Sequence, residues 1–185
     1  MITPANLHST ILRSHLKFVP PLHRVFHPQA DQGHVEHYLR HHPLPIIAHL
    51  GRAHTLGENE PITEPPHEFV YANNAALRLF RFPSEQELIG RHSHTVLPAH
   101  PVHSHRVHHV DAFKDLRKSG YSTDNSGYWR TKYNDVFRSN GTVFWNLLDE
   151  VDGDRVIGYA GALVRNEKCP WFYDDEYHKL HLDEF

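Results

Sequence analysis

Short apolar runs, bounded by Pro, Gly and Asn, set the first elements of the chain. Pro45–Leu50 and Glu68–Tyr71 are both rich in β-branched, aromatic or other apolar residues, and each predicts a short strand. A run of good helix formers, Ala75–Phe80, follows the second strand, and Asn73 or Asn74 is placed to cap it. The pattern therefore predicts two strands followed directly by a short helix.

Two further helices are expected before the chain turns to strands. Pro83–Gly90 has acidic residues in its first turn, Ser84 as a candidate cap and a glycine at its end. A longer helix is predicted from Val102 to Lys118, ended by Gly120. Apolar residues recur along it at a spacing of three and form one stripe: Val107, Val110, Phe113 and Leu116.

The last part of the chain predicts an antiparallel meander. Asn140-Gly141 is the dipeptide preferred in tight hairpins, and Tyr133–Arg138 and Thr142–Asp149 on either side of it favour strands. Asp152-Gly153 predicts a second turn before Arg155–Val164. Two strands, several helices and a meander together indicate an α+β fold, a sheet covered on one face by helices.

Local residue composition divides the chain into three segments. Residues 1–43 are rich in His and Pro, and Thr10–Lys17 and His34–His42 are expected to form short helices in an extension that docks on the domain. The domain itself is expected over residues 44–166. Residues 167–185 form an acidic and aromatic tail, interpreted as a strap over an exposed sheet face, with a partner-binding motif as the alternative.

Composition narrows the classes of function. Hydrophobic residues make up 39% of 185, enough for one modest core. The net charge of −3 gives no electrostatic reason to expect nucleic acid or a membrane surface as partner. Cys169 is the single cysteine, which excludes an internal disulfide and fits a reducing compartment. The sequence pattern predicts neither a membrane span nor a signal peptide, so we expect the cytoplasm or nucleus.

Several runs resemble one known family. Phe69–Phe80 (FVYANNAALRLF), followed by Glu87–Arg91 (ELIGR), is similar to the second strand and following helices of PAS domains. Phe144–Glu150 (FWNLLDE) and then Gly158–Ala162 (GYAGA) resemble the MEKHLA subgroup, PAS-related domains found alone in microbes and at the end of some plant homeodomain–leucine-zipper regulators. This stand-alone form is the expected one here, and the resemblance covers about Pro45–Val164.

The resemblance implies a five-stranded antiparallel sheet with helices over one face and a sensory or protein-interaction role without catalysis. A homodimer or partner protein, and a small-molecule ligand, are the partners expected from the last strand, as described below. The chain departs from the family pattern at His92-Ser93-His94 and over His100–His105, where Arg and Glu are expected. These positions therefore inherit no function from the family.

Histidine is the unusual residue of this sequence, at 20 of 185. His105 and His109 are four apart on the expected long helix, close enough to share a metal ion, and His103, two residues before His105, is a further candidate ligand. PAS relatives that bind haem use a histidine from this helical region, so a His-ligated metal or haem protein with redox or oxygen-sensing chemistry is the alternative function. A solvated histidine-rich surface is the more common explanation of such spacing. A pH-responsive protein is a third hypothesis, because histidine titrates near neutrality.

A ligand pocket is predicted from the last strand. Gly158, Ala160 and Ala162 share one face by the period-two rule and leave space above the sheet, which side chains, a partner or a ligand must fill. Asn146 adds a polar group among apolar neighbours. The predicted pocket also includes Tyr71, Asn73, Asn74 and Phe113.

The opposite face of the same strand is predicted to be an interface. Ile157, Tyr159 and Leu163 are large, and Trp145 adds aromatic surface from the neighbouring strand. No protease, hydrolase, phosphate-loop or dinucleotide-binding motif is present. Because Cys169 lies past the last strand, cysteinyl flavin photochemistry is not expected, whereas haem, a metal ion or a non-covalently bound flavin stay open as cofactors.

Overall fold

The structure is a computed structural model that describes residues 4–28, 34–51, 68–96, 112–149 and 155–168. Its centre is an antiparallel sheet, and the resemblance's five-stranded sheet is confirmed as the path β2-β1-β5-β4-β3. A sixth short strand pairs with one end of β4. The strands are β1 (Ile46–Leu50), β2 (Glu68–Ala72), β3 (Tyr121–Arg130), β4 (Val136–Leu148), β5 (Val156–Ala162) and β6 (Arg165–Lys168).

The hairpin predicted at Asn140-Gly141 is wrong, because β4 runs through this dipeptide without a turn. Asn125 pairs with Thr142 and Gly127 with Ser139, so three steps along β4 oppose two along β3. One extra residue on β4 is a β-bulge, and Gly141 supplies the positive φ, +70°, that such a bulge uses.

The hairpin itself lies earlier in the chain. β3, which the sequence pattern did not predict, joins β4 through Thr131–Asp135, where Asn134 has a φ of +68°. The Thr131 hydroxyl accepts from the backbone N–H groups of Tyr133 and Asp135 and thereby holds the turn. The predicted Asp152-Gly153 turn lies outside the described residues, although β4 and β5 on either side of it pair antiparallel as expected.

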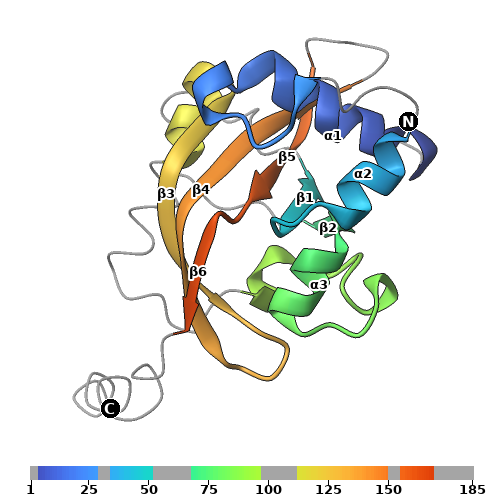
Figure 1. Ribbon diagram of the computed structural model, residues 1–185, viewed down its shortest axis with the longest axis vertical. Coiled ribbons are helices and arrows are strands. Elements are labelled where there is room, and N and C mark those ends of the chain that lie inside the picture. The colour runs from blue at the N-terminus through green and yellow to red at the C-terminus, as the bar shows by residue number, and fades with distance from the viewer. Residues whose placement is uncertain (1–3, 29–33, 52–67, 97–111, 150–154, 169–185) are drawn as a thin grey trace.

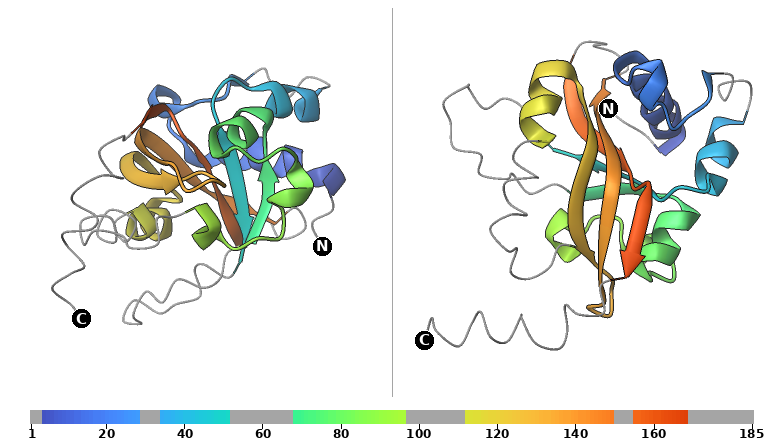
Figure 2. Two further views of the ribbon diagram at one scale, coloured as in Figure 1. Left: turned by 90° about the horizontal axis from the view of Figure 1, so that it is seen from below. Right: turned by 60° about the vertical axis from the view of Figure 1, so that its left-hand side comes forward.

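Helices lie on both faces of the sheet. We call the face covered by α3 (Asn74–Phe80), η3 (Glu85–Glu87), η4 (Ser93–Val96) and the helix of residues 112–119 the inner face. The face covered by α1 (Pro4–Phe18) and α2 (Val35–His41) is the outer face. Figure 1 shows α1 and α2 in the upper part of the molecule and α3 in the lower part. The right-hand view of Figure 2 shows helix 112–119 and α1 on opposite sides of β3 and β4. The expected covering of a single face is therefore incomplete, because the N-terminal helices cover the other.

Most predicted helices are present with altered lengths. The helix expected at Thr10–Lys17 is α1, which starts earlier, at Pro4. The helix expected at His34–His42 is α2. Between α1 and α2 lies a short 3-10 turn, η1 (Pro21–His23), which ends at Arg24. None of the helices in the described ranges is long and apolar enough to span a membrane.

Two helix predictions need correction or restriction. Pro83–Gly90 forms only the single 3-10 turn η3, and the Ser84 side chain makes no capping hydrogen bond. The long helix is seen over residues 112–119 and ends at Gly120 with a φ of +79°, as the glycine predicted. Its first half, residues 102–111, lies outside the described residues.

Asn73 holds the N-terminus of α3 in place. Its Oδ1 accepts a hydrogen bond from the Ala76 N–H at 2.9 Å, which confirms it as the helix cap. The same oxygen accepts from Ile46 N–H at 3.0 Å, at the start of β1. Because one side chain bonds both elements, β1 and α3 have a fixed relation.

Candidate functional site

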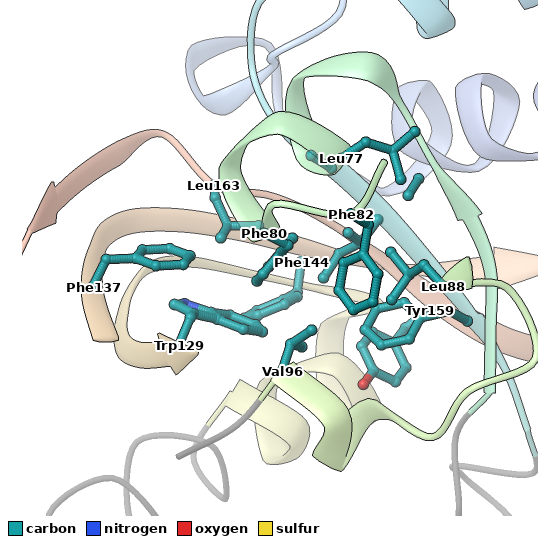
Figure 3. Close-up of a cluster of buried hydrophobic side chains, with 14 of the residues drawn as sticks. Leu77, Phe80, Phe82, Leu88, Val96, Trp129, Phe137, Phe144, Tyr159 and Leu163 are labelled. Carbon is teal, nitrogen blue, oxygen red and sulfur yellow. The ribbon is translucent and has the colours of Figure 1, made fainter. Parts of the chain in front are cut away.

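The inner face of the sheet carries the larger aromatic core. Aromatic rings from four strands and from α3 pack against one another, and in Figure 3 they lie between Leu77 of α3 and Val96 of η4. Phe80 contacts Trp129 and Phe137, with ring centroids 5.9 and 5.6 Å apart. Tyr159 lies at one side of this cluster, and its hydroxyl points away from Leu77 and Phe82 in Figure 3. The cluster is therefore apolar at its centre and has a polar rim.

That rim is a row of polar side chains across adjacent strands, which we call the inner-face row: His49, Tyr159 and Asn146. Strand register brings them together, because Tyr159 pairs with His49 of β1 on one side and with Asn146 of β4 on the other. The His49 and Tyr159 rings stack with centroids 4.7 Å apart and planes at 23°. Phe69 and Phe113 flank the two rings at 4.2 Å from His49 and 5.3 Å from Tyr159. All three members of the row are buried.

Asn146 connects the row to helix 112–119. Its Nδ2 donates to Leu116 O at 2.9 Å and its backbone N–H to Gly120 O at 2.8 Å, so it caps the end of that helix. The residue is only 5% exposed, and its Oδ1 makes no hydrogen bond within the described part of the chain. A buried acceptor without a donor is costly, about 1–3 kcal/mol, unless another group supplies one. This oxygen is the polar atom of the inner face that a ligand could satisfy.

The structure divides the predicted pocket between both faces. Phe113 and Asn146 belong to the inner face. Ala160 and Ala162, with Gly158 on the same side of β5, belong to the outer face. The small residues do leave space, and α1 fills it rather than a ligand pocket.

The other predicted pocket residues lie on β2 and α3. Tyr71 packs in the outer-face core, where its ring meets His8 edge to face at 5.3 Å. Its hydroxyl is buried without a hydrogen-bond partner among the described residues, and burial raises its pKa well above the usual value. The Asn73 amide is occupied by backbone groups, so it has no capacity left for a ligand. Asn74, partly exposed, is the first residue of α3.

The exposed interface expected on β5 is also absent, because the chain buries these residues itself. Tyr159 and Leu163 are 6% and 0% exposed and belong to the inner-face core. Trp145 is fully buried beneath α1, and Ile157 is partly buried at the edge of the outer-face core. The period-two rule separated Tyr159 and Leu163 from Ala160 and Ala162 correctly, but Ile157 packs on the outer face instead of with Tyr159. The rule also assigned the wrong cover to each side.

The predicted metal or haem ligands His103, His105 and His109 lie outside the described residues. Within the ranges that the structure describes, no three His, Cys, Asp or Glu side chains are grouped to hold a metal ion. Three histidines, His34, His37 and His41, lie at or next to α2. The ring centroids of His37 and His41 are 4.4 Å apart.

Sequence patterns did not predict a second cluster, which lies on the outer face. His15, Phe26, His42 and Trp145 come together there, and we call them the outer-face cluster. His15 is fully buried, with its ring 4.5 Å from Phe26 and 4.9 Å from Trp145. Phe26 also meets His42 edge to face at 5.2 Å. The helical spacing of Ile11 and His15 on one side of α1 is the signal that could have identified it.

Burial makes the outer-face histidines weak bases. Desolvation first, and then the Arg24 and His42 charges, lowers the pKa of His15 to about 3. The pKa of His42 is also lowered, chiefly by burial, against hydrogen bonds to Val25 and Leu44 that raise it. Burial likewise lowers the pKa of His8. All three imidazoles are therefore neutral in the folded protein at pH 7.

The model of the MEKHLA domain matches residues 6–166, which is most of the chain. The chain belongs to the MEKHLA family. This match begins well before Pro45, so α1 and α2 lie within the part that the MEKHLA domain model covers. Among curated proteins, none matches the chain.

Solved structures share the fold of this MEKHLA domain at low sequence identity. An RNA-binding light-oxygen-voltage receptor is 16% identical with a TM-score of 0.52, over 81% of this chain and 36% of the receptor, so the chain spans about a third of that protein. The PAS domain of a protein from Colwellia psychrerythraea is 11% identical with a TM-score of 0.51, over 72% of this chain and 92% of that domain. The MEKHLA domain therefore has a PAS-like fold, as the resemblance predicted.

Proposed function

We propose that this MEKHLA domain is a sensory module that binds a small ligand at the inner-face row and passes the signal on by contact with a second copy or a partner protein. It has no catalytic activity of its own in this proposal. The observation that carries the proposal is the buried Asn146 Oδ1, an acceptor to which no described residue donates, beside two stacked aromatic rings. A small molecule with a ring and an N–H or O–H group could stack on the aromatic rings and donate a hydrogen bond to Asn146 Oδ1.

The ligand would sit between the sheet and helix 112–119. Asn146 already bonds that helix through Leu116 O and Gly120 O, so a group that binds its Oδ1 acts on the same side chain that holds the helix end. Phe113, one turn earlier on the helix, contacts Tyr159 of the row. A ligand in the row is therefore coupled to the position of the helix.

The first experiment is to purify the untagged chain without a nickel column and to record its absorbance, native mass and metal content. We expect a small organic molecule to be carried by the protein and released on unfolding, and the native mass of a homodimer. A Soret band or stoichiometric metal that disappears on mutation of His105 or His109 would favour the haem or metal alternative. An empty protein that no compound of a metabolite collection stabilises against heat would contradict the proposal.

Two substitutions at one position then test the role of Asn146. Asn146→Asp keeps an acceptor oxygen and loses the hydrogen bond to Leu116 O, whereas Asn146→Leu loses both. We expect the affinity for the co-purified ligand, measured by titration calorimetry, to fall about tenfold more in Asn146→Leu than in Asn146→Asp, as one lost hydrogen bond predicts. Equal losses would show that Asn146 acts only through the helix.

A further inference from the structure

His15 is a buried polar group in the contact between α1 and the sheet. Its side chain is fully buried, between Phe26 of the following segment and Trp145 of β4. Trp145 itself is bonded to α1, because its Nε1 donates to Ile11 O at 3.2 Å. The Ser14 hydroxyl accepts from Leu148 N–H at 3.0 Å. The imidazole thus lies among the contacts that hold α1 on the outer face.

Hydrogen bonds fix the protonation of both histidines in the outer-face cluster. The Val25 N–H donates to His15 Nε2 at 3.2 Å, so this nitrogen is the acceptor and the proton is on Nδ1. Leu44 N–H donates to His42 Nδ1 at 3.3 Å, which leaves His42 Nε2–H to donate to Val25 O at 3.2 Å. The two rings hold the peptide groups of Val25 from both sides. Both need to be neutral to do so at their accepting nitrogens.

A proton added to His15 would find no favourable place. It would go to Nε2, which would then present an N–H to the Val25 N–H and lose that hydrogen bond. Nδ1 is buried and makes no hydrogen bond to any described group. The charge would thus be placed in an apolar contact with one hydrogen bond fewer than before.

The two ionisable groups that act on His15, Arg24 and His42, are both basic. From the segment after α1 comes Arg24, whose guanidinium donates to Leu16 O at 2.9 Å and Val19 O at 3.0 Å. From the segment after α2 comes His42, and β4 contributes the uncharged Trp145. The charges that act on His15 are those of Arg24 and His42, and both oppose its protonation.

We propose that acidification releases α1 from the outer face of the sheet through protonation of His15, reinforced by His42. The geometry opposes packing and protonation to each other, since in the packed cluster His15 Nε2 accepts from Val25 N–H and the protonated ring has no accepting nitrogen. Release uncovers the apolar outer face of β4 and β5. This inference goes beyond the proposed ligand function and does not depend on it.

The direction and size follow from proton linkage. A released His15 in water takes up its proton near the ordinary pKa of 6.5, whereas the packed ring does so only near 3. Between these values the released state binds the extra proton, so falling pH favours release, about tenfold per pH unit for this histidine. Between pH 7.5 and 5.5 the fraction released should therefore rise about tenfold.

Hydrogen–deuterium exchange of the full chain tests this, with rates corrected for the intrinsic effect of pH. We expect the protection of amides in α1 to fall about tenfold or more between pH 7.5 and 5.5, while amides of β4 and β5 keep theirs. The glutamine in His15→Gln does not titrate and offers an acceptor to Val25. In this variant the protection of the α1 amides should therefore fall about tenfold less than in the wild type between the same two pH values. His23→Gln, a partly exposed histidine of the next segment, is the matched control and should behave as the wild type.

Three results would overturn the inference: α1 amides with unchanged protection at pH 5.5, an equal loss in His15→Gln, or loss in α1 only together with the whole sheet. Should His15→Gln fail to fold, His15→Phe takes its place, because it keeps an aromatic ring between Phe26 and Trp145 without a titrating group. The same three results decide the question in that variant.

Discussion

At the scale of single residues, Asn73 shows how much one side chain contributes beyond its local role. Its Oδ1 accepts from Ala76 and Ile46, and its Nδ2 lies within hydrogen-bond distance of three carbonyl oxygens at the end of α2 and beyond: Leu39 at 3.3 Å, His42 at 3.2 Å and Leu44 at 2.9 Å. One amide thus joins α2, β1 and α3. Its neighbour Asn74 makes no comparable set of bonds to the described residues and is partly exposed.

We predict that Asn73→Ala lowers the free energy of unfolding by about 2–4 kcal/mol, because it removes a helix cap and leaves buried backbone groups unpaired. Asn74→Ala is the matched control and should cost less than about 0.5 kcal/mol, as surface changes usually do. Urea unfolding of both variants gives the values. Similar losses in the two variants would contradict the role assigned to Asn73.

The sequence predicted the cap but not its tertiary bonds, and this difference has a physical basis. Capping is a contact between residues three apart, so an Asn before a run of helix formers indicates it directly. The bonds of Asn73 to Leu39 and Leu44 span 34 and 29 residues, and no local pattern encodes them. Asn146 is similar, because its neighbours in sequence predict a buried polar group without telling which helix it bonds.

At the scale of elements, α1 and helix 112–119 meet although they cover opposite faces of the sheet. The contact is at Gly120, where an added Cβ would lie 2.1 Å from the Phe18 ring. Gly120 also accepts the backbone hydrogen bond of Asn146. The end of the inner-face helix therefore lies directly against the last residue of α1.

Gly120→Ala should be more destabilising than the same change at Gly90. Both glycines have similar positive φ values, +79° and +82°, which cost alanine about 1–2 kcal/mol each. A Cβ at Gly90 meets nothing within 4 Å, so the excess at Gly120, which we expect to be about 2 kcal/mol, reports the clash with Phe18.

The Phe18→Ala background supplies the check, because there the two glycine substitutions should cost the same. Thermal or urea unfolding of the four variants measures this coupling. An excess at Gly120 that persists without the Phe18 ring would show that another contact is responsible.

The sequence patterns of the strands predicted which strands pair, but they did not predict which helices cover each side of a strand. Asn140-Gly141 provides the positive φ of a turn, but a bulge within a continuous strand uses the same conformation, and the sequence does not distinguish the two. For β5, alternation separates Tyr159 from Ala160 without stating which side α1 covers. That assignment depends on a helix far away in the chain, so it became visible only with the structure.

At the scale of the whole molecule, the buried histidines make stability depend on pH. The pKa of His15 is depressed in the folded state, so the unfolded chain binds more protons between pH 6.5 and about 3. Folding stability is therefore complete above pH 6.5 and declines as the pH falls through this window.

We predict that the free energy of unfolding falls by about 1.4 kcal/mol for each pH unit below 6.5 through His15 alone, with His42 and His8 adding to the decline. Urea unfolding between pH 7.5 and 5 measures the slope. In His15→Gln the decline per pH unit should be smaller by about 1.4 kcal/mol, the contribution of one proton. A slope equal to that of the wild type would show that other groups cause the acid sensitivity.

The order of the strands also has a consequence for how this protein is made. β1 lies between β2 and β5, so one of its two partners is a strand that ends more than a hundred residues later. The Ile11–Trp145 bond likewise joins residues 134 apart. As the chain leaves the ribosome, α1 has no sheet to rest on until β4 and β5 have been synthesised. We expect folding to be a late and comparatively slow event, in which the amphipathic first helix stays without its partner for most of translation.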